Sequence, residues 1–420
     1  MDGRPDTSVE DDFLADFATM SGFGATDRGG VERQAATAAD GEQRRWLAGL
    51  LEAFGARVVY DRIGNQYGLL ELTPGARYVL VGSHMDSQPT AGRYDGAYGV
   101  LAAAHAVRQV ARDYDEQGKR PKYNLAVVNW FNEEGSRFKP SMMGSGVYAG
   151  KLDPRRTLEA EDVTGVSVQD ALDAIGTRAD ADGPPAAAYA EIHIEQGRGL
   201  EKDGLQIGLV RATWGANKYE FTVTGEQAHT GSTAMADRHD ALLGASMLVV
   251  AAREIADMFD DGVLHSSVGQ MLIYPNSPVV VASKVSLLLD LRSLDPDVLA
   301  EADRLLHERI AQIQIAAGVE IEQATSHKWG VLPYADSGVA LAEEVVRELG
   351  YSYGRTETLA GHDSTNLKDV VPTVMLFVPS VDGISHNEQE YTHDEDMIAG
   401  LAVLTKIVAR LADGALDETR

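Results

Sequence analysis

The chain of 420 residues contains no cysteine. This absence excludes disulfide bonds, thiolate metal ligands and a cysteine nucleophile, so any metal site must be built from histidine, aspartate and glutamate. Long apolar runs are also missing, since none approaches the roughly 18 residues that a membrane span requires. The start of the chain lacks the basic and apolar segments of a secretory signal, and we therefore expect a cytoplasmic protein with no membrane partner.

Basic residues are few, with 37 Lys and Arg against 64 Asp and Glu, a net charge of −27 and a pI near 4.7. Such a surface should repel nucleic acid, which is therefore not an expected partner. One hypothesis is that the acidity is an adaptation to a salty cytoplasm, where salt screens the repulsion between carboxylates. An ordinary acidic enzyme is the alternative.

The length exceeds what one hydrophobic core usually supports, so two domains are expected. Strands and helices alternate as in an α/β domain up to residue 212 and again from 328, whereas 213–327 has the pattern of a compact α+β insert. The predicted fold class is α/β, with a catalytic domain formed by 1–212 and 328–420 and an inserted domain at 213–327.

The periodicity of apolar residues predicts the individual elements. Buried strands are expected at 78–81, 123–131, 190–194 and 373–378, and other strands at 56–60, 68–72, 218–224 and 285–291. Helices are expected within 10–55 and at 98–110, 239–259, 297–317, 339–349 and 394–411, and a loop at 179–188.

Histidines and carboxylates follow the predicted buried strands. An isolated His-x-Asp pair means little, but here the pattern recurs along the chain, and ligands of open α/β sheets bind beyond the carboxyl ends of the strands. Imidazole and carboxylate together suit zinc or a similar divalent ion. The candidate ligands are His84, Asp95, Glu134, His193 and His386.

Four carboxylates in or beside this set can have different tasks. Asp95 can bridge two ions because each of its oxygens can bind one. In the pair Glu133-Glu134, one carboxylate can bind metal while the other takes a proton from the attacking water. Asp86 lies two residues after His84, and we expect its side chain to accept a hydrogen bond from that ring and fix its tautomer.

Several segments carry a resemblance to one family. They resemble the dinuclear zinc amidohydrolases of the M20 peptidase clan, and within it the amidase/hydantoinase/carbamoylase family of N-carbamoyl-L-amino acid hydrolases, β-ureidopropionases and allantoate amidohydrolases. The run Ser87-Gln88-Pro89-Thr90 is most similar to the β-ureidopropionase-like branch. The matching segments are 82–99, 130–138, 143–147, 193–197, 228–235, 361–363 and 379–388.

The resemblance implies two divalent ions, zinc first among them, with manganese, cobalt or nickel as alternatives. One ion would be held by His84, Asp95 and His193, and the other by Asp95, Glu134 and His386. Glu133 would be the general base, with Asp86 as the orienting carboxylate. A histidine at position 193, where peptide-cleaving relatives carry a carboxylate, points away from peptide hydrolysis.

The resemblance also implies that the inserted domain is a lid and dimerisation domain. Its His229 would cross to the active site of the partner subunit and stabilise the oxyanion, which requires a homodimer. Arg292 would bind the substrate carboxylate, and the other substrate contacts would be Gln196, Gly361 and His362. The alternatives are that His229 only caps its own turn and that Arg292 forms a surface ion pair.

The sequence departs from the family pattern in two runs, 275–283 and 232–235. The family's carboxylate-binding asparagine falls on Val279, whose side chain cannot form a hydrogen bond. We therefore expect a substrate with a weaker carboxylate clamp or a different polar group.

Together these features predict a metal-dependent amidohydrolase that cleaves a linear, non-peptide C–N bond. The expected substrate is an N-carbamoyl amino acid or a related ureide, which would yield an amino acid, ammonia and carbon dioxide. An allantoate amidohydrolase, an aminoacylase and a dipeptidase are the alternatives within enzymes. A non-catalytic binding protein would be expected to lose Glu133 or a metal ligand, and none is lost.

Overall fold

The computed structural model describes residues 8–358 and 360–417, and the chain forms two compact units. The large unit consists of two segments, Met1–Arg211 and Tyr334–Arg420, and the inserted unit is Ala212–Pro333. The predicted boundary after residue 327 falls inside a strand that continues to Trp329. Among the described residues, no helix is both long and apolar enough to cross a membrane.

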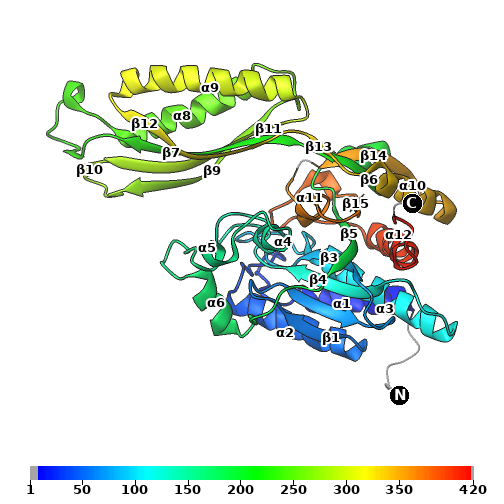
Figure 1. Ribbon diagram of the computed structural model, residues 1–420. Coiled ribbons are helices and arrows are strands. Elements are labelled where there is room, and N and C mark those ends of the chain that lie inside the picture. Colours follow the sequence, from blue (N-terminus) through cyan, green and yellow to red (C-terminus); the bar gives the residue numbers. More distant parts are fainter. Residues whose placement is uncertain (1–7, 359, 418–420) are drawn as a thin grey trace. The chain divides into compact units, whose positions relative to one another are not determined.

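A mixed sheet forms the centre of the large unit, with the strand order β1-β2-β4-β3-β5-β15-β6 and β14 beside β6 (Figure 1). The short strand β13, whose residues belong to the inserted unit, pairs with the last residues of β6. The central pairs β4–β3, β3–β5 and β5–β15 are parallel, so their carboxyl ends lie along one edge of the sheet. The strands are β1 (Arg57–Tyr60), β2 (Gln66–Leu70), β3 (Tyr78–His84), β4 (Asn124–Trp130), β5 (Ala186–Ile194), β6 (Ile207–Thr213), β13 (Leu332–Pro333), β14 (Tyr353–Thr358) and β15 (Thr373–Val378).

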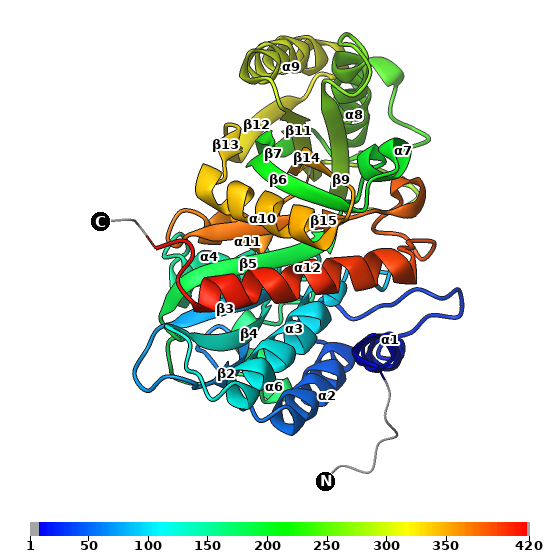
Figure 2. The same cartoon turned by 90° about the vertical axis from the view of Figure 1, so that its right-hand side faces the viewer.

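Helices cover both faces of this sheet. In Figure 2, α3 and α12 run in front of β3 and β5, and Figure 1 shows α4 and α11 on the opposite face. The helices are α1 (Val9–Met20), α2 (Ala38–Ala53), α3 (Ala97–Glu116), α4 (Met143–Tyr148), α5 (Pro154–Leu158), α6 (Val168–Ile175), α7 (Gly199–Asp203), α10 (Asp336–Leu349), α11 (Asp363–Leu367) and α12 (Asp394–Ala412), with the 3-10 helix η2 (Val381–Gly383).

The sequences of β4, β15 and α3 explain this layering. Every residue of β4 and β15 is buried, as expected for strands covered on both faces. The helix α3 begins with an alanine-rich, almost entirely buried run that favours helix and allows close packing. At Gly99, a Cβ would lie 2.2 Å from the carbonyl oxygen of Ile192, so only glycine permits this approach of α3 to β5.

The inserted unit is a four-stranded antiparallel sheet, ordered β12-β7-β11-β9, with α8 and α9 on one face (Figure 1). Alternate residues of β11 from Val285 to Leu291 are buried against these helices and form a second core. The elements are β7 (Gly215–Thr224), β8 (Ala228–His229), η1 (Met235–Asp237), α8 (Ala241–Ala256), β9 (His265–Tyr274), β10 (Val280–Val281), β11 (Lys284–Ser293), α9 (Pro296–Ala317) and β12 (Glu320–Trp329).

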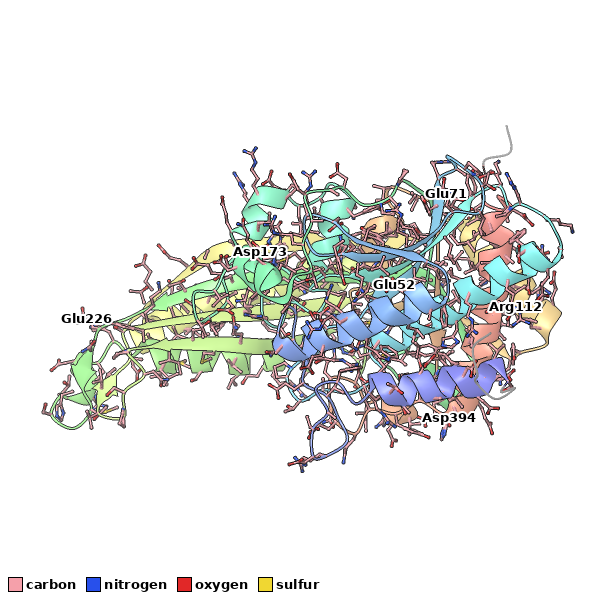
Figure 3. The ribbon with its side chains drawn as sticks, turned by 90° about the horizontal axis from the view of Figure 1, so that it is seen from below. Glu52, Glu71, Arg112, Asp173, Glu226 and Asp394 are labelled. Carbon is pink, nitrogen blue, oxygen red and sulfur yellow. The ribbon has the colours of Figure 1, made fainter. Side chains whose placement is uncertain are left out.

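Acidic side chains are distributed over the surfaces of both units. In Figure 3, Glu52 on α2 and Asp173 on α6 carry exposed carboxylates of the large unit, and Glu226 carries one on the inserted unit. Many arginines are already paired, as Arg112 is with Glu116 at 2.8 Å. Exposed carboxylates such as Glu52 and Glu226 face solvent, where salt can screen their mutual repulsion.

Candidate metal centre

The predicted metal ligands come from the carboxyl ends of the parallel strands. His84 is the last residue of β3, and His193 is the penultimate residue of β5. Glu134 follows β4, and His386 follows β15 and η2. Asp95 lies in the loop between β3 and α3. Because these strands are parallel neighbours, the loops that follow them meet at one edge of the sheet.

The structure brings the five side chains into two groups that share Asp95. One group is His84, Asp95 and His193, and the other is Asp95, Glu134 and His386; within each group the potential ligand atoms lie within 4.8 Å of one another. Asp95 Oδ1 lies 3.0 Å from His193 Nε2, whereas its Oδ2 lies 3.1 Å from His386 Nε2. Each oxygen of the shared carboxylate therefore faces a different group.

Backbone carbonyls fix the two buried histidines. His84 Nδ1 lies 3.0 Å from the carbonyl oxygen of Asp86, and His193 Nδ1 lies 2.9 Å from that of Ile194. A carbonyl oxygen only accepts, so each Nδ1 carries a hydrogen, and in the neutral ring the lone pair is then on Nε2. This is the tautomer that a metal ligand requires.

Asp86 contacts His84 as predicted, but the prediction that its carboxylate makes the hydrogen bond is wrong. The Asp86 carboxylate oxygen is 3.7 Å from His84 Nδ1, and the carbonyl of Asp86 makes the hydrogen bond instead. The carboxylate accepts from the backbone N–H groups of Glu133 at 3.2 Å and Glu134 at 3.3 Å. Asp86 therefore ties the turn that carries both glutamates to the end of β3. Burial raises its pKa to about 6, against the opposing charge of His84.

Glu133 lies beside the first group without belonging to it. Its Oε2 is 3.6 Å from His84 Nε2, and its backbone carbonyl accepts from the N–H of Met142 at 2.7 Å. Burial raises the pKa of Glu133 well above its usual range, although the charge of His84 opposes this shift. The Glu133 carboxylate therefore lies at the centre but belongs to neither ligand group.

Asp95 is held in place from several sides. Gln196 Nε2 donates to Asp95 Oδ2 at 2.8 Å and to Ser385 Oγ at 2.9 Å. The buried Glu390 accepts from the backbone N–H groups of Tyr94 and Asp95 and from the Ser385 hydroxyl. Burial alone would raise the pKa of Asp95, but hydrogen bonds from the surrounding histidines hold it well below its usual range. Asp95 is therefore ionised at neutral pH.

Sequence reasoning missed Glu390 and gave Gln196 a different task. Gln196 was predicted to contact substrate, whereas here its amide nitrogen is engaged by the shared carboxylate. Glu390 lies four residues after His386, in the same polar run, and that proximity is the signal by which it could have been found.

The donor set fits a divalent metal ion. It combines imidazole nitrogens with carboxylate oxygens, a combination that divalent transition metals favour. Glu134 Oε1 is buried, and no residue of the described chain offers it a hydrogen bond. An orphaned, buried carboxylate oxygen beside other ligand atoms is expected where a cation supplies the missing interaction.

The remaining predicted residues are distributed over both units. In the large unit His362 is buried, with its ring centroid 4.5 Å from that of His193, and Gly361 lies against the Met142 side chain. His229 and Arg292 belong to the inserted unit, and their catalytic roles stay predictions. His229 Nδ1 accepts from two backbone N–H groups of its own turn, and Arg292 donates to Asp290 Oδ2.

Comparison with known proteins identifies the family. Residues 80–410 match the model of peptidase family M20/M25/M40. A relative from Mycolicibacterium smegmatis, described only as a hydrolase, is 56% identical over 98% of this chain and 95% of its own length. The N-carbamoyl-L-amino-acid amidohydrolase of Rhizobium meliloti is 36% identical over 94% of each chain.

A solved structure extends this likeness to the fold. The crystal structure of a hydantoinase/carbamoylase family amidase from Burkholderia vietnamiensis covers 98% of this chain and 100% of its own, with a TM-score of 0.90 and 36% identity. The predicted α/β fold class with two domains is confirmed. The chain belongs to peptidase family M20/M25/M40 and is a hydrolase of its amidase/hydantoinase/carbamoylase group.

Proposed function

We propose that this amidohydrolase cleaves the C–N bond of an N-carbamoyl amino acid or a related linear ureide. The observation that carries the proposal is the pair of ligand groups that share Asp95, with His193 in the first group and Glu133 free beside it. The relative from Rhizobium meliloti is named as an N-carbamoyl-L-amino-acid amidohydrolase, an enzyme of the same reaction class, and this likeness supports the proposal.

The two ligand groups support two divalent ions, with zinc as the first candidate and manganese, cobalt or nickel as alternatives. His84, Asp95 and His193 would hold one ion. Asp95, Glu134 and His386 would hold the other. When bound, the ions would polarise the scissile carbonyl and make the attacking water more acidic.

Glu133 would act as general base and general acid. Its carboxylate takes a proton from the attacking water while the water oxygen bonds to the carbonyl carbon. The bond between that carbon and the amino-acid nitrogen then breaks, and Glu133 returns the proton to the leaving nitrogen. The released carbamate decomposes to ammonia and carbon dioxide, so one ureide yields an amino acid and both small products.

His229 would donate a hydrogen bond to the developing oxyanion. Its Nδ1 accepts from the N–H groups of Gly231 at 3.0 Å and Ser232 at 3.1 Å, so the neutral ring carries its hydrogen on Nε2. The residue is exposed, which leaves this N–H available to a ligand. The turn that His229 caps therefore also sets the tautomer that an oxyanion donor needs.

The geometry of the inserted unit supports a homodimer in which His229 serves the partner's site. At about 3.3 Å per residue, the part of β11 from Lys284 to Arg292 spans about 26 Å. His229 lies on β8, which follows β7 in the chain just beyond the end of the sheet where Thr224 pairs with Lys284. A small ureide cannot reach both ends, so a substrate that contacts Arg292 and His229 takes them from two chains.

Substrate recognition is expected to differ from that of carbamoylases with an asparagine at position 279. Val279 is 59% exposed, and its carbonyl accepts from the N–H of Thr230, beside His229. If His229 reaches the substrate, the apolar side chain of Val279 lies close to the substrate as well. We therefore propose that Arg292 is the main carboxylate contact, helped by Gly361 and His362, and that the clamp is weaker or directed at another polar group.

A hydrolysis screen of the metal-loaded protein tests the proposal. The panel contains N-carbamoyl-β-alanine, N-carbamoyl-L-amino acids, allantoate and N-acetyl-amino acids, with Glu133→Gln as the control for contaminating enzymes. Turnover of a ureide by the wild type alone supports the proposal. Turnover of N-acetyl-amino acids only would assign the protein to the acylases, and no turnover of any substrate would refute the substrate class.

A further inference from the structure

Gln88 contacts the proposed metal ligand Glu134, and the reaction scheme assigns no role to this contact. It lies half-buried in the loop between β3 and α3. Its Nε2 donates to Glu134 Oε2 at 2.9 Å and to the backbone carbonyl oxygen of Glu134 at 3.2 Å. Both neighbours are acceptors, so the amide nitrogen is the atom that faces Glu134. One side chain thus holds both the carboxylate and the backbone of this ligand.

The two ligand groups are fixed in different ways. In the first group, backbone carbonyls orient the rings of His84 and His193. In the second group, His386 has a side chain that is 49% exposed, and its Nε2 is 3.4 Å from Glu134 Oε2. The Glu134 backbone N–H is held by Asp86, but this bond does not orient the carboxylate. The orientation of that carboxylate depends on Gln88 to a large extent.

The orphaned oxygen of Glu134 shows the consequence of this contact. Gln88 occupies Oε2, whereas Oε1 is buried and receives no hydrogen bond from the described residues. A donor on one oxygen limits rotation of the carboxylate. Without that donor the side chain could turn and lose its alignment with Asp95 and His386, at the more exposed side of the centre.

We propose that Gln88 is a positioning residue that orients Glu134 and thereby sets the affinity of the Asp95–Glu134–His386 group for its ion. This inference rests on the proposed two-ion centre. Side chains that hold a metal ligand by hydrogen bonds typically change metal affinity by about 10- to 100-fold when they are removed. The effect should be confined to one group, because the hydrogen bonds described for the Gln88 side chain both go to Glu134. The Nδ1 atoms of His84 and His193 are held by backbone carbonyls instead.

The first test is a Zn²⁺ titration of the chelator-stripped full chain, followed by calorimetry and without any substrate. The variants are Gln88→Leu, which removes the donor, and Gln88→Asn, which shortens its reach. Gln109→Leu is the matched control, since Gln109 Nε2 donates to the Asp113 carboxylate at 2.7 Å on α3. We expect one of two binding transitions to weaken about 10- to 100-fold in Gln88→Leu and neither to change in Gln109→Leu.

The second test assigns the affected ion. His386→Ala should remove the same transition that Gln88→Leu weakens, and the double variant should then bind its remaining ion as His386→Ala does. Two unchanged transitions in folded Gln88→Leu and Gln88→Asn would overturn the inference, as would further weakening in the double variant or a single transition in the wild type. Because no substrate is present, failure of the ureide screen leaves this result unaffected.

Discussion

A methyl group at Gly96 should displace the proposed metal ligand His84. Gly96 has a φ of +62°, and a Cβ at this position would lie 2.3 Å from His84 Nε2 and 2.4 Å from Cδ2 and Cε1 of the same ring. Carbon atoms normally approach to about 3.5–4.0 Å, so the imidazole in Gly96→Ala must retreat by about 1 Å or more. Metal–ligand distances tolerate deviations of only about 0.2 Å. We therefore expect the His84–Asp95–His193 group to lose its ion.

Gly118→Ala separates this clash from backbone strain. Gly118 has a nearly equal φ of +61°, but no heavy atom lies within 4 Å of its Cβ position. Both substitutions place alanine in an unfavourable conformation and should each lower the free energy of unfolding by about 1–3 kcal/mol. Only Gly96→Ala should also weaken metal binding.

The assay combines urea unfolding of the metal-free variants with a Zn²⁺ titration. For Gly96→Ala we expect at least about a 10-fold loss of affinity in one transition, with Gly118→Ala binding as the wild type does. Wild-type affinity in folded Gly96→Ala would refute the assignment of His84 as a metal ligand.

Further predictions concern the base, the substrate clamp, stability and salt. Glu133→Gln should lower kcat by about 10²- to 10⁴-fold with unchanged metal content; a smaller loss would exclude Glu133 as the base. Val279→Asn should lower KM for carboxylate-bearing ureides, and an unchanged substrate profile would contradict the shifted-substrate proposal. Burial raises the pKa of Asp61 from 3.8 to about 6, so the unfolded chain loses this proton first as the pH rises, and stability should fall by about 3 kcal/mol between about pH 4 and 6. The difference in urea stability between the wild type and Asp61→Asn measures this, and a constant difference over that range would speak against it. Finally, unfolding midpoints should rise with KCl if the acidity is a salt adaptation; a plateau above moderate salt would exclude it.

The grouping of the candidate ligands could be predicted because its signal is local. An apolar run that ends in a histidine or a carboxylate marks a strand end, and parallel strands bring such ends together. This reasoning was sufficient for His84, Asp95 and His193, which come from neighbouring strands and the loop between β3 and α3.

Contacts between segments that are far apart in the chain could not be predicted from the sequence. A pattern does not distinguish the carbonyl of Asp86 from its carboxylate as the partner of His84. Gln88 was visible only as part of a motif, because its partner Glu134 is 46 residues away. In the same way, the helices predicted within 10–55 gave no sign that residues between α1 and α2, such as Arg33, bond to the loop after β3.

The central claim is tested most directly by the products of one matched pair of substrates. The metal-loaded wild type is given the N-carbamoyl and the N-acetyl derivatives of the same amino acid, and the release of ammonia and amino acid is measured together. We predict equal amounts of ammonia and amino acid from the N-carbamoyl derivative and no amino acid from the N-acetyl derivative. Release of amino acid from the N-acetyl derivative, with none from the N-carbamoyl derivative, would contradict the claim.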